Sequence, residues 1–246
     1  MDLLVGSLVL RPYVFVFLGI FLAVGTMDLG WRRTLLFWFW VWPVAWLAEY
    51  TSTRIGIPFG LYHYTGLTRG RELYISNVPF FDSLSFTFLA YASFCLARAA
   101  LPRRTVSRTE LAILAGVLMM ALDVVIDPLA VRGDRWFLGR IFYYPAGGVY
   151  FGVPLSNFVG WVIVGAVGVG GYLGLTREPG GRRPAGGIAL YYAVASFNLG
   201  MTAWIGEWWL AAVGATLHAA VAVALRYLAH RAEPSLDFGG RGIQRA

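Results

Sequence analysis

The sequence predicts an all-α membrane protein, a polytopic bundle of about seven transmembrane helices. Hydrophobic residues make up 58% of the 246 positions and charged residues 13%, whereas a soluble domain is closer to half apolar and a quarter charged. The apolar residues are gathered into blocks, and ten tryptophans are available for the membrane interfaces, where this residue is enriched. Helix is the expected spanning form, because backbone groups in lipid must be satisfied within their own segment.

Seven apolar segments follow one another along the chain, and each is close to the ~20 residues that a helix needs to cross the hydrocarbon. They are expected at residues 9–29, 34–51, 77–99, 109–130, 150–175, 187–205 and 207–229. We expect residues 1–230 to form one transmembrane helical domain and residues 231–246 to be a polar, disordered tail. The first segment is long and has no basic region before it, so it is expected to stay as an anchor.

All twenty basic residues are arginines, and the formal net charge is +7. They fall in short loops between apolar segments rather than on one solvated face, so we do not expect a nucleic-acid partner. With the N-terminus outside, the inner loops and tail hold thirteen arginines and the outer side seven. This bias predicts an N-out, C-in orientation in the cell inner (plasma) membrane.

Two segments on the predicted outer side differ from ordinary apolar sequence. Residues 52–76 and 131–149 are rich in glycine and tyrosine and carry both charge signs. We expect them to form ordered caps over the mouth of the bundle, and ordinary loops are the alternative.

Acidic side chains at the ends of the expected spans gather on this same outer side. The polar residues placed there are Glu49, Asp82, Asp123, Asp127, Asn157 and Glu207. A carboxylate in a bilayer is costly unless it is paired, hydrated or neutralised, so such residues are functional candidates. We interpret the group as a polar pocket, and the alternative is that these are helix-end residues satisfied by caps or loop arginines. Asp28 lies near the inner end, where surface pairing with Arg32 or Arg33 is sufficient.

The stretch ALDVVIDPLA places Asp123 and Asp127 four residues apart, and therefore on one face of a helix. Two carboxyl groups that are close together in a dry site cannot both ionise easily, so one of them keeps its proton. The pair could therefore supply an acid and a base within one helical turn.

Aromatic residues flank the proposed mouth, among them Tyr62, Tyr64, Trp136 and Tyr150. Ring faces stabilise cations, although aromatic residues also cover lipid-facing helices. The three histidines are scattered without metal-ligand spacing, and no phosphate loop or nucleophile elbow is present. We therefore expect neither a metal nor a cofactor.

Three stretches in this order resemble the CruF-type membrane carotenoid hydratases, a family that includes bisanhydrobacterioruberin hydratase and the 1′-hydratase of gamma-carotene or lycopene ends. They are AEYTSTRIGIPFGLYHYTG (48–66), ALDVVIDPLAV (121–131) and GGVYFGVPLSNFVGW (147–161), which together cover less than half of the chain. The residues within the matching motifs are Glu49, Gly60, Tyr62, Asp123, Asp127, Pro128, Gly152, Pro154, Asn157 and Trp161. Asp82 has no matching position.

The resemblance implies that water is added across the terminal C1=C2 double bond of an acyclic carotenoid such as lycopene, gamma-carotene or a C50 analogue. Protonation of C2 leaves a tertiary cation at C1, which water captures. We expect Asp123 or Asp127 to be the acid, with the other aspartate or Glu49 as base, and Asn157 to orient the water. The expected substrate-binding residues are Tyr62, Tyr64, Trp136, Tyr150, Trp161 and Asp82, with Tyr62, Tyr64 and Trp136 shielding the cation.

Two alternatives remain open at this point. A membrane carotenoid cyclase would use the same protonation but let a neighbouring double bond capture the cation. A non-catalytic protein that binds or transports carotenoids, in contact with membrane lipid, is the second alternative. A pump that carries retinal on a lysine is excluded, because the sequence contains no lysine.

Overall fold

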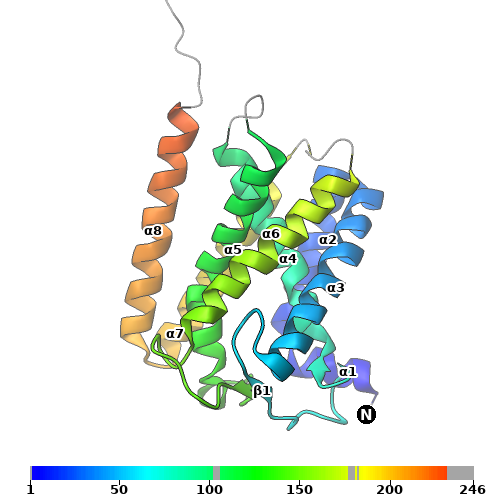
Figure 1. The fold of residues 1–246 in the computed structure, drawn as a ribbon, viewed down its shortest axis with the longest axis vertical. Coiled ribbons are helices and arrows are strands. Elements are labelled where there is room, and N and C mark those ends of the chain that lie inside the picture. Colours follow the sequence, from blue (N-terminus) through cyan, green and yellow to red (C-terminus); the bar gives the residue numbers. More distant parts are fainter. Residues whose placement is uncertain (1, 102–105, 177–180, 182, 232–246) are drawn as a thin grey trace, which may run out of the picture.

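The computed structural model describes residues 2–101, 106–176, 181 and 183–231, and shows a bundle of long helices that is closed at one end by irregular segments (Figure 1). Successive long helices alternate in direction, so every second connection lies at the closed end. The expected polar tail, residues 231–246, lies outside the described residues except for Arg231, the last residue of α8.

The described residues contain eight α-helices: α1 (Leu3–Leu10), α2 (Pro12–Leu29), α3 (Trp31–Ile55), α4 (Phe80–Ala100), α5 (Arg108–Ala130), α6 (Leu155–Leu175), α7 (Ala185–Trp204) and α8 (Trp208–Arg231). The shorter elements are β1 (His63–Tyr64), β2 (Tyr74–Ile75), β3 (Val78–Pro79), η1 (Gly133–Arg135) and β4 (Phe142–Tyr143). The seven apolar segments expected from the sequence correspond to α2 to α8 in order, which confirms the all-helical prediction.

Five of these helices, α2, α4, α5, α6 and α8, are long and apolar enough to cross a membrane. Large apolar side chains face outward from them at helical spacing, as Val159, Ile163 and Val167 do on α6. Side chains of this kind suit contact with lipid. Helices α3 and α7 have 25 and 20 residues, which is sufficient length, but their mean hydropathy is lower.

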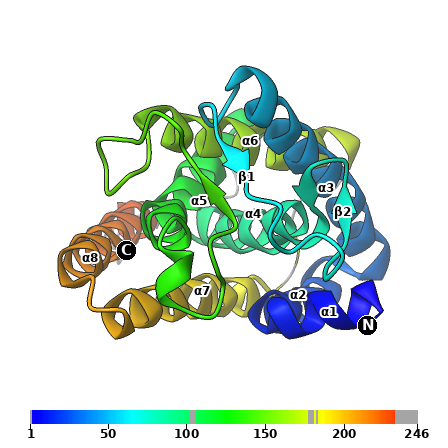
Figure 2. The same ribbon diagram turned by 90° about the horizontal axis from the view of Figure 1, so that it is seen from below.

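The first expected segment, residues 9–29, is divided in the structure. Pro12 occupies the first position of α2, where a residue without an N–H group is tolerated and its fixed φ favours the helix. Residues 3–10 form the separate helix α1, which lies across the end of the bundle beside the cap (Figure 2). Arg11 lies at the junction of the two helices and is only 1% exposed.

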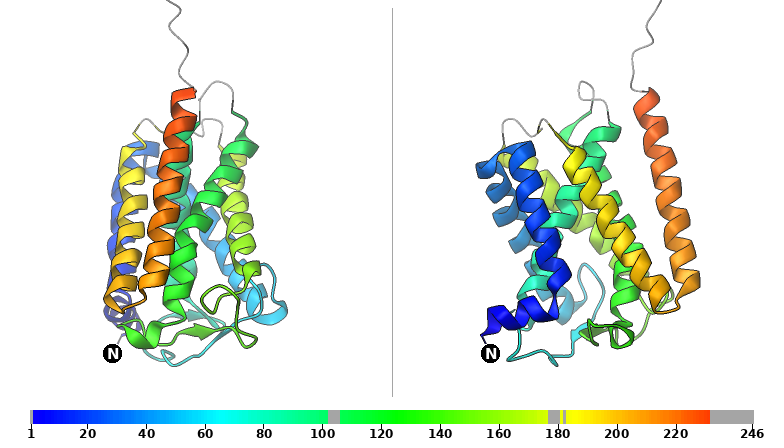
Figure 3. Two further views of the ribbon diagram at one scale, coloured as in Figure 1. Left: turned by 90° about the vertical axis from the view of Figure 1, so that its left-hand side faces the viewer. Right: turned by 180° about the vertical axis from the view of Figure 1, so that it is seen from behind.

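Helix α4 passes through the centre of the bundle. In its most apolar stretch of 18 residues 83% of the residues are buried, whereas in the corresponding stretch of α8 22% are buried. Figure 3 shows α8 at the edge of the bundle. Helices α5 and α6 approach most closely at two glycines: a Cβ atom on Gly116 would lie 2.4 Å from the Val162 carbonyl oxygen, and one on Gly165 2.8 Å from the Gly116 Cα. This contact fixes the spacing between the two helices that carry Asp127 and Asn157.

The two outer segments meet each other over the closed end. Strand β1 pairs with β4 in antiparallel register, with His63 opposite Tyr143 and Tyr64 opposite Phe142. The backbone N–H of Thr65 donates to the Ile141 carbonyl at 2.8 Å. The prediction of ordered caps is confirmed for residues 56–76 and 131–149, which are joined by these hydrogen bonds, whereas residues 52–55 are the end of α3.

Candidate active site

A cavity of about 110 Å³ lies beneath this cap, enclosed by α2 to α7 and the two capping segments. Eight of the ten residues predicted for the site line it: Glu49, Tyr62, Tyr64, Asp82, Asp127, Trp136, Asn157 and Trp161. They come from α3, α4, α5, α6 and both caps. Residues that are far apart in the sequence are therefore brought to one place.

Asp127 faces the cavity from the last turn of α5, and neighbours on α6 hold it in place. The Trp161 indole Nε1 donates to Asp127 Oδ2 at 3.2 Å, and the Asn157 amide donates to Asp123 Oδ2 at 2.7 Å. Both Asn157 and the Asp123 carboxyl lie within hydrogen-bonding reach of Asp127. The two aspartates therefore interact as their spacing predicted, and they share the neutral Asn157 as partner.

Asp123 and Tyr150 are the two predicted site residues that do not line the cavity. Asp123 is fully buried behind Asp127, and its Oδ1 has no hydrogen-bond partner among the described residues. Tyr150 packs against Phe151 and Phe158, away from the cavity. Asp123 thus reaches the cavity only through Asp127 and Asn157.

Glu49 lines the cavity from α3, and its Oε2 is buried without a partner among the described residues. The hydroxyl of Tyr64 lies within hydrogen-bonding reach of this carboxyl. Burial, and after it the Glu49 carboxyl, raises the pKa of both Tyr62 and Tyr64 in the cap. Both hydroxyls therefore stay protonated and can act as neutral donors.

The rest of the cavity wall is aromatic. Phe86 stacks on Trp161 with ring centroids 4.4 Å apart and 13° between the planes, and Phe59 packs against both rings. In the cap, Tyr62 contacts the rings of Tyr64, Phe142 and Tyr144. Val14 and Phe17 on α2 and Val194 on α7 add apolar side chains to the wall. The cavity therefore places carboxyl groups beside ring faces and hydrocarbon.

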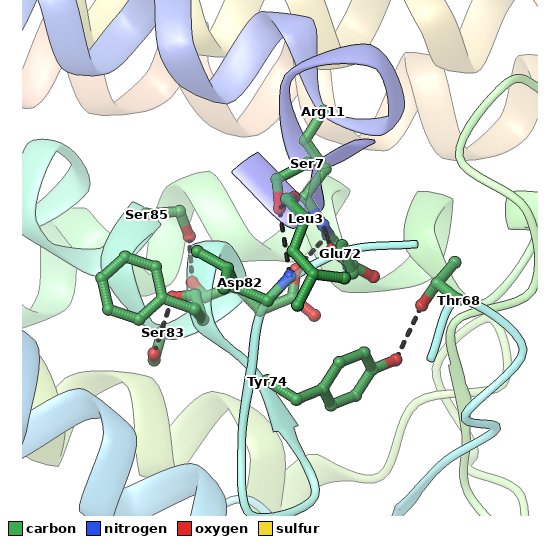
Figure 4. A network of polar contacts seen from close by, with 11 residues as sticks. Leu3, Ser7, Arg11, Thr68, Glu72, Tyr74, Asp82, Ser83 and Ser85 are labelled. Carbon is green, nitrogen blue, oxygen red and sulfur yellow. Dashed lines mark hydrogen bonds and ion pairs between the residues drawn. The ribbon is translucent and has the colours of Figure 1, made fainter. Parts of the chain in front are cut away.

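Asp82 is the one cavity carboxyl that has a cationic partner in the described chain. Arg11 donates to it from Nη1 and also binds Glu72, from Nε to Oε2 at 2.5 Å and from Nη2 to Oε1 at 3.1 Å (Figure 4). Arg11 and Glu72 are two residues of this region that the sequence did not indicate, because Arg11 is one of the seven arginines expected on the outer side. An arginine directly before the proline of an apolar segment was the available signal.

Glu207 does not belong to the site, although it was placed in the outer acidic group. It forms an ion pair with Arg135, and Arg132 Nε lies 3.3 Å from its Oε1, so the alternative of a helix-end residue satisfied by loop arginines is the correct one. The expectation for Asp28 was also wrong. Asp28 is 5% exposed rather than at the surface, and it binds Arg98 at 2.9 Å.

The described residues contain no group of three or more His, Cys, Asp or Glu side chains close enough to hold a metal ion. What the arrangement does offer is several carboxyl groups with different partners around a small, largely aromatic space. Such a site can donate a proton to an apolar molecule, stabilise a cation with ring faces, and hold a water molecule.

Comparison with known proteins shows the family to which the chain is related. A family model described as "Carotenoid biosynthesis protein" matches residues 9–222. The bisanhydrobacterioruberin hydratase of Haloarcula japonica is 31% identical over 173 residues, which cover 68% of this chain and 56% of the relative. The chain thus spans about half the length of that curated relative. No solved structure matches.

Proposed function

The chain belongs to the carotenoid biosynthesis protein family, and from that premise we propose that it is a hydratase that acts on a carotenoid within the membrane. The proposed reaction adds water across the terminal C1=C2 double bond of an acyclic end, as in lycopene, gamma-carotene or a C50 analogue. The observation that carries the proposal is the set of buried carboxyl groups with neutral partners that face an aromatic cavity. The name of the Haloarcula relative supports it.

In the proposed mechanism, Asp127 donates a proton to C2 of the substrate. Asp123 stands behind Asp127 and shares Asn157 with it, so a proton held by the pair can be passed to the cavity side. The tertiary cation that remains at C1 faces the rings of Tyr62, Tyr64 and Trp136. Asn157 orients the water that attacks C1, and Glu49 also faces the cavity, from α3.

The size of the cavity favours binding of one end of the substrate. A volume of about 110 Å³ is several times the space that one water molecule needs, but small for a whole drug-sized ligand. The apolar part of the wall, formed by Val14, Phe17 and Val194, would contact the first part of the polyene. The remainder of this long molecule would lie between the helices and the lipid.

The proposal includes the arrangement in the membrane. All seven long helices, α2 to α8, would span the bilayer as one domain, with the N-terminus outside and the C-terminus inside the cell inner membrane. The cavity would then open near the outer surface. Five of these helices have sufficient hydropathy by themselves, and α3 and α7 would be stabilised by their neighbours.

The test is expression in a bacterium that accumulates lycopene, followed by mass analysis of the extracted pigments. A hydratase adds the mass of water to the pigment. A cyclase yields an isomer of unchanged mass and different retention time, and a protein that only binds carotenoid leaves the pigment unchanged. Either of the last two results would contradict the proposal, provided that the protein is detected in the membrane fraction.

A further inference from the structure

The buried ion network around Arg11 divides the cavity carboxyls into two kinds. Arg11 is 1% exposed and binds Glu72, itself 2% exposed, through two hydrogen bonds. A third bond joins its Nη1 to Asp82 Oδ1. Glu72 does not line the cavity, whereas Asp82 does.

The formal charges of this network do not cancel. One guanidinium faces two carboxylates, so the network carries a net charge of −1, and the carboxylate on the cavity side is Asp82. The other cavity carboxyls have no cationic partner among the described residues. Asn157, Trp161 and the Asp123 carboxyl lie beside Asp127, and Tyr64 lies beside Glu49. An arginine paired with a carboxylate keeps both groups ionised, whereas a buried carboxyl with neutral partners is easily kept protonated.

Hydration needs one carboxyl of each kind. A neutral acid must protonate C2, and an ionised carboxylate must accept the proton that the attacking water loses. We propose that Asp82 is this ionised carboxylate, and that Arg11 and Glu72 are positioning residues that hold it in place and in its charged form. This inference rests on the proposed function and assigns the base of that reaction.

The step balances without any further reactant. The proton from Asp127 forms the new C2–H bond while the π bond between C1 and C2 breaks. The oxygen of water bonds to C1, and the proton that this water releases passes to Asp82. Return of one proton from Asp82 to Asp127, through water in the cavity, restores the starting state. The negative charge of Asp82 also favours the cation at C1 electrostatically.

The geometry allows this role to be tested without destroying the network. In Asp82→Asn, Arg11 keeps both of its hydrogen bonds to Glu72, so its charge remains compensated and the junction of α1 and α2 is retained. Arg11→Gln combined with Glu72→Gln removes the whole support of Asp82 but leaves the Asp82 carboxyl present. Arg11→Lys keeps the positive charge and is the conservative control.

The experiment measures product formation in membranes that contain the protein and lycopene, with and without sodium azide. Azide captures a carbocation directly and releases no proton, so it needs the acid but not the base. We expect Asp82→Asn to lose the alcohol by about 100-fold and to form a tertiary azide adduct when azide is present. The Arg11→Gln/Glu72→Gln variant should show the same shift in part, and Arg11→Lys should mostly restore the alcohol.

The acid variant Asp127→Asn is the matched comparison and should form neither product. The ratio of azide adduct to alcohol does not depend on the amount of folded protein, so partial loss of a variant from the membrane does not obscure the result. If Asp82→Asn is absent from the membrane, the ratio of azide adduct to alcohol is compared between Arg11→Lys and Arg11→Gln/Glu72→Gln instead. A higher ratio in Arg11→Gln/Glu72→Gln supports the assignment, and equal ratios contradict it. Asp82→Asn protein that forms neither product, or that forms alcohol at the wild-type rate, would overturn the assignment. A wild-type protein that forms no alcohol would instead refute the proposed function.

Discussion

The two ends of the bundle each bury carboxyl groups, but among the described residues only the capped end leaves carboxyl oxygens buried without a partner. At the end opposite the cap, Asp28 accepts two bonds from Arg98, at 2.9 and 3.1 Å, one from the Arg183 N–H at 2.8 Å and one from the Tyr91 hydroxyl at 3.2 Å. At the capped end, Glu49 Oε2 and Asp123 Oδ1 are buried without a partner among the described residues. A cavity adjoins Glu49 there.

This difference separates Asp28, whose oxygens are all used by protein groups, from Glu49 and Asp123, whose free oxygens can take a further partner. A buried polar atom without a partner costs about 1–3 kcal/mol, which is unfavourable unless the atom has another use. Asp28 has no spare capacity, and a Cβ atom on Gly181 would lie only 2.0 Å from its Oδ1, so no ligand has room there. Burial by itself therefore does not identify the site. The carboxyl groups of the site either line the cavity, as Glu49, Asp82 and Asp127 do, or contact one that does, as Asp123 does.

The largest expected effect is that of Asp127→Asn. This change removes the proposed proton donor but leaves an amide oxygen that still accepts from Trp161. We expect alcohol formation in membranes to fall about a thousandfold, within the range of general acid catalysis, with little change in thermal stability. Liquid chromatography with mass detection measures the rate. If Asp127→Asn formed the alcohol at the wild-type rate, Asp127 would not be the proton donor, and the carboxyls of the capped end would not differ in role from Asp28.

Asp28→Asn should show the reverse pattern. Removal of one charge from a buried ion pair leaves Arg98 uncompensated, and we expect the free energy of unfolding to fall by about 3–5 kcal/mol. The hydration rate per folded molecule should stay within about threefold of the wild type. Thermal unfolding in detergent, combined with the activity assay, measures both. Arg98→Met added to Asp28→Asn should recover part of the lost stability; loss of activity without loss of stability would give Asp28 a chemical role.

Trp161→Phe sharpens the comparison within the capped end. The smaller ring can still stack on Phe86, but the indole N–H that donates to Asp127 at 3.2 Å is lost. We expect hydration to slow about tenfold, which corresponds to roughly 1.4 kcal/mol, with a small change in stability. Trp46→Phe is the matched control, because its Nε1 donates to the Ile75 carbonyl outside the cavity. If both variants lost the same share of the hydration rate, the bond from the Trp161 N–H to Asp127 would have no specific role in the reaction.

Glu207→Gln is expected to have the smallest effect. Glu207 is 22% exposed in its side chain and pairs with Arg135, which is 44% exposed, and such pairs contribute less than about 1 kcal/mol. Both unfolding temperature and hydration rate should remain close to those of the wild type. A strong loss of hydratase activity would show that Glu207 does belong to the site, as its position in the sequence had suggested.

Much of the fold could be predicted from the sequence, because hydrophobic blocks of membrane length dictate helices whatever their partners. The gathering of Glu49, Asp82 and Asp127 at one end follows from the alternating direction of consecutive spans. The same alternation of direction places Glu207 at this end too. Only the structure shows that arginines after α5 reach it, since Arg135 is 72 residues away in the sequence.

The parts that could not be predicted depend on contacts between distant residues. Arg11 meets Glu72 and Asp82 over separations of 61 and 71 residues, and Asp28 meets Arg98 over 70, although Arg32 and Arg33 are its neighbours in sequence. The spacing of Asp123 and Asp127 predicted a common helix face but not that only Asp127 reaches the cavity. Which of the two aspartates reaches the cavity depends on how α6 packs against α5 through Gly116 and Gly165.

The central claim is that the capped cavity adds water to a carotenoid end, and the most direct measurement follows the oxygen atom. Membranes that contain the wild-type protein and lycopene are incubated in ¹⁸O-labelled water under ordinary oxygen gas, and the pigments are analysed by mass. The account predicts a new alcohol whose oxygen is ¹⁸O, formed by the wild type and not by Asp127→Asn. An alcohol that carries ordinary oxygen, or an isomer that carries none, would contradict it.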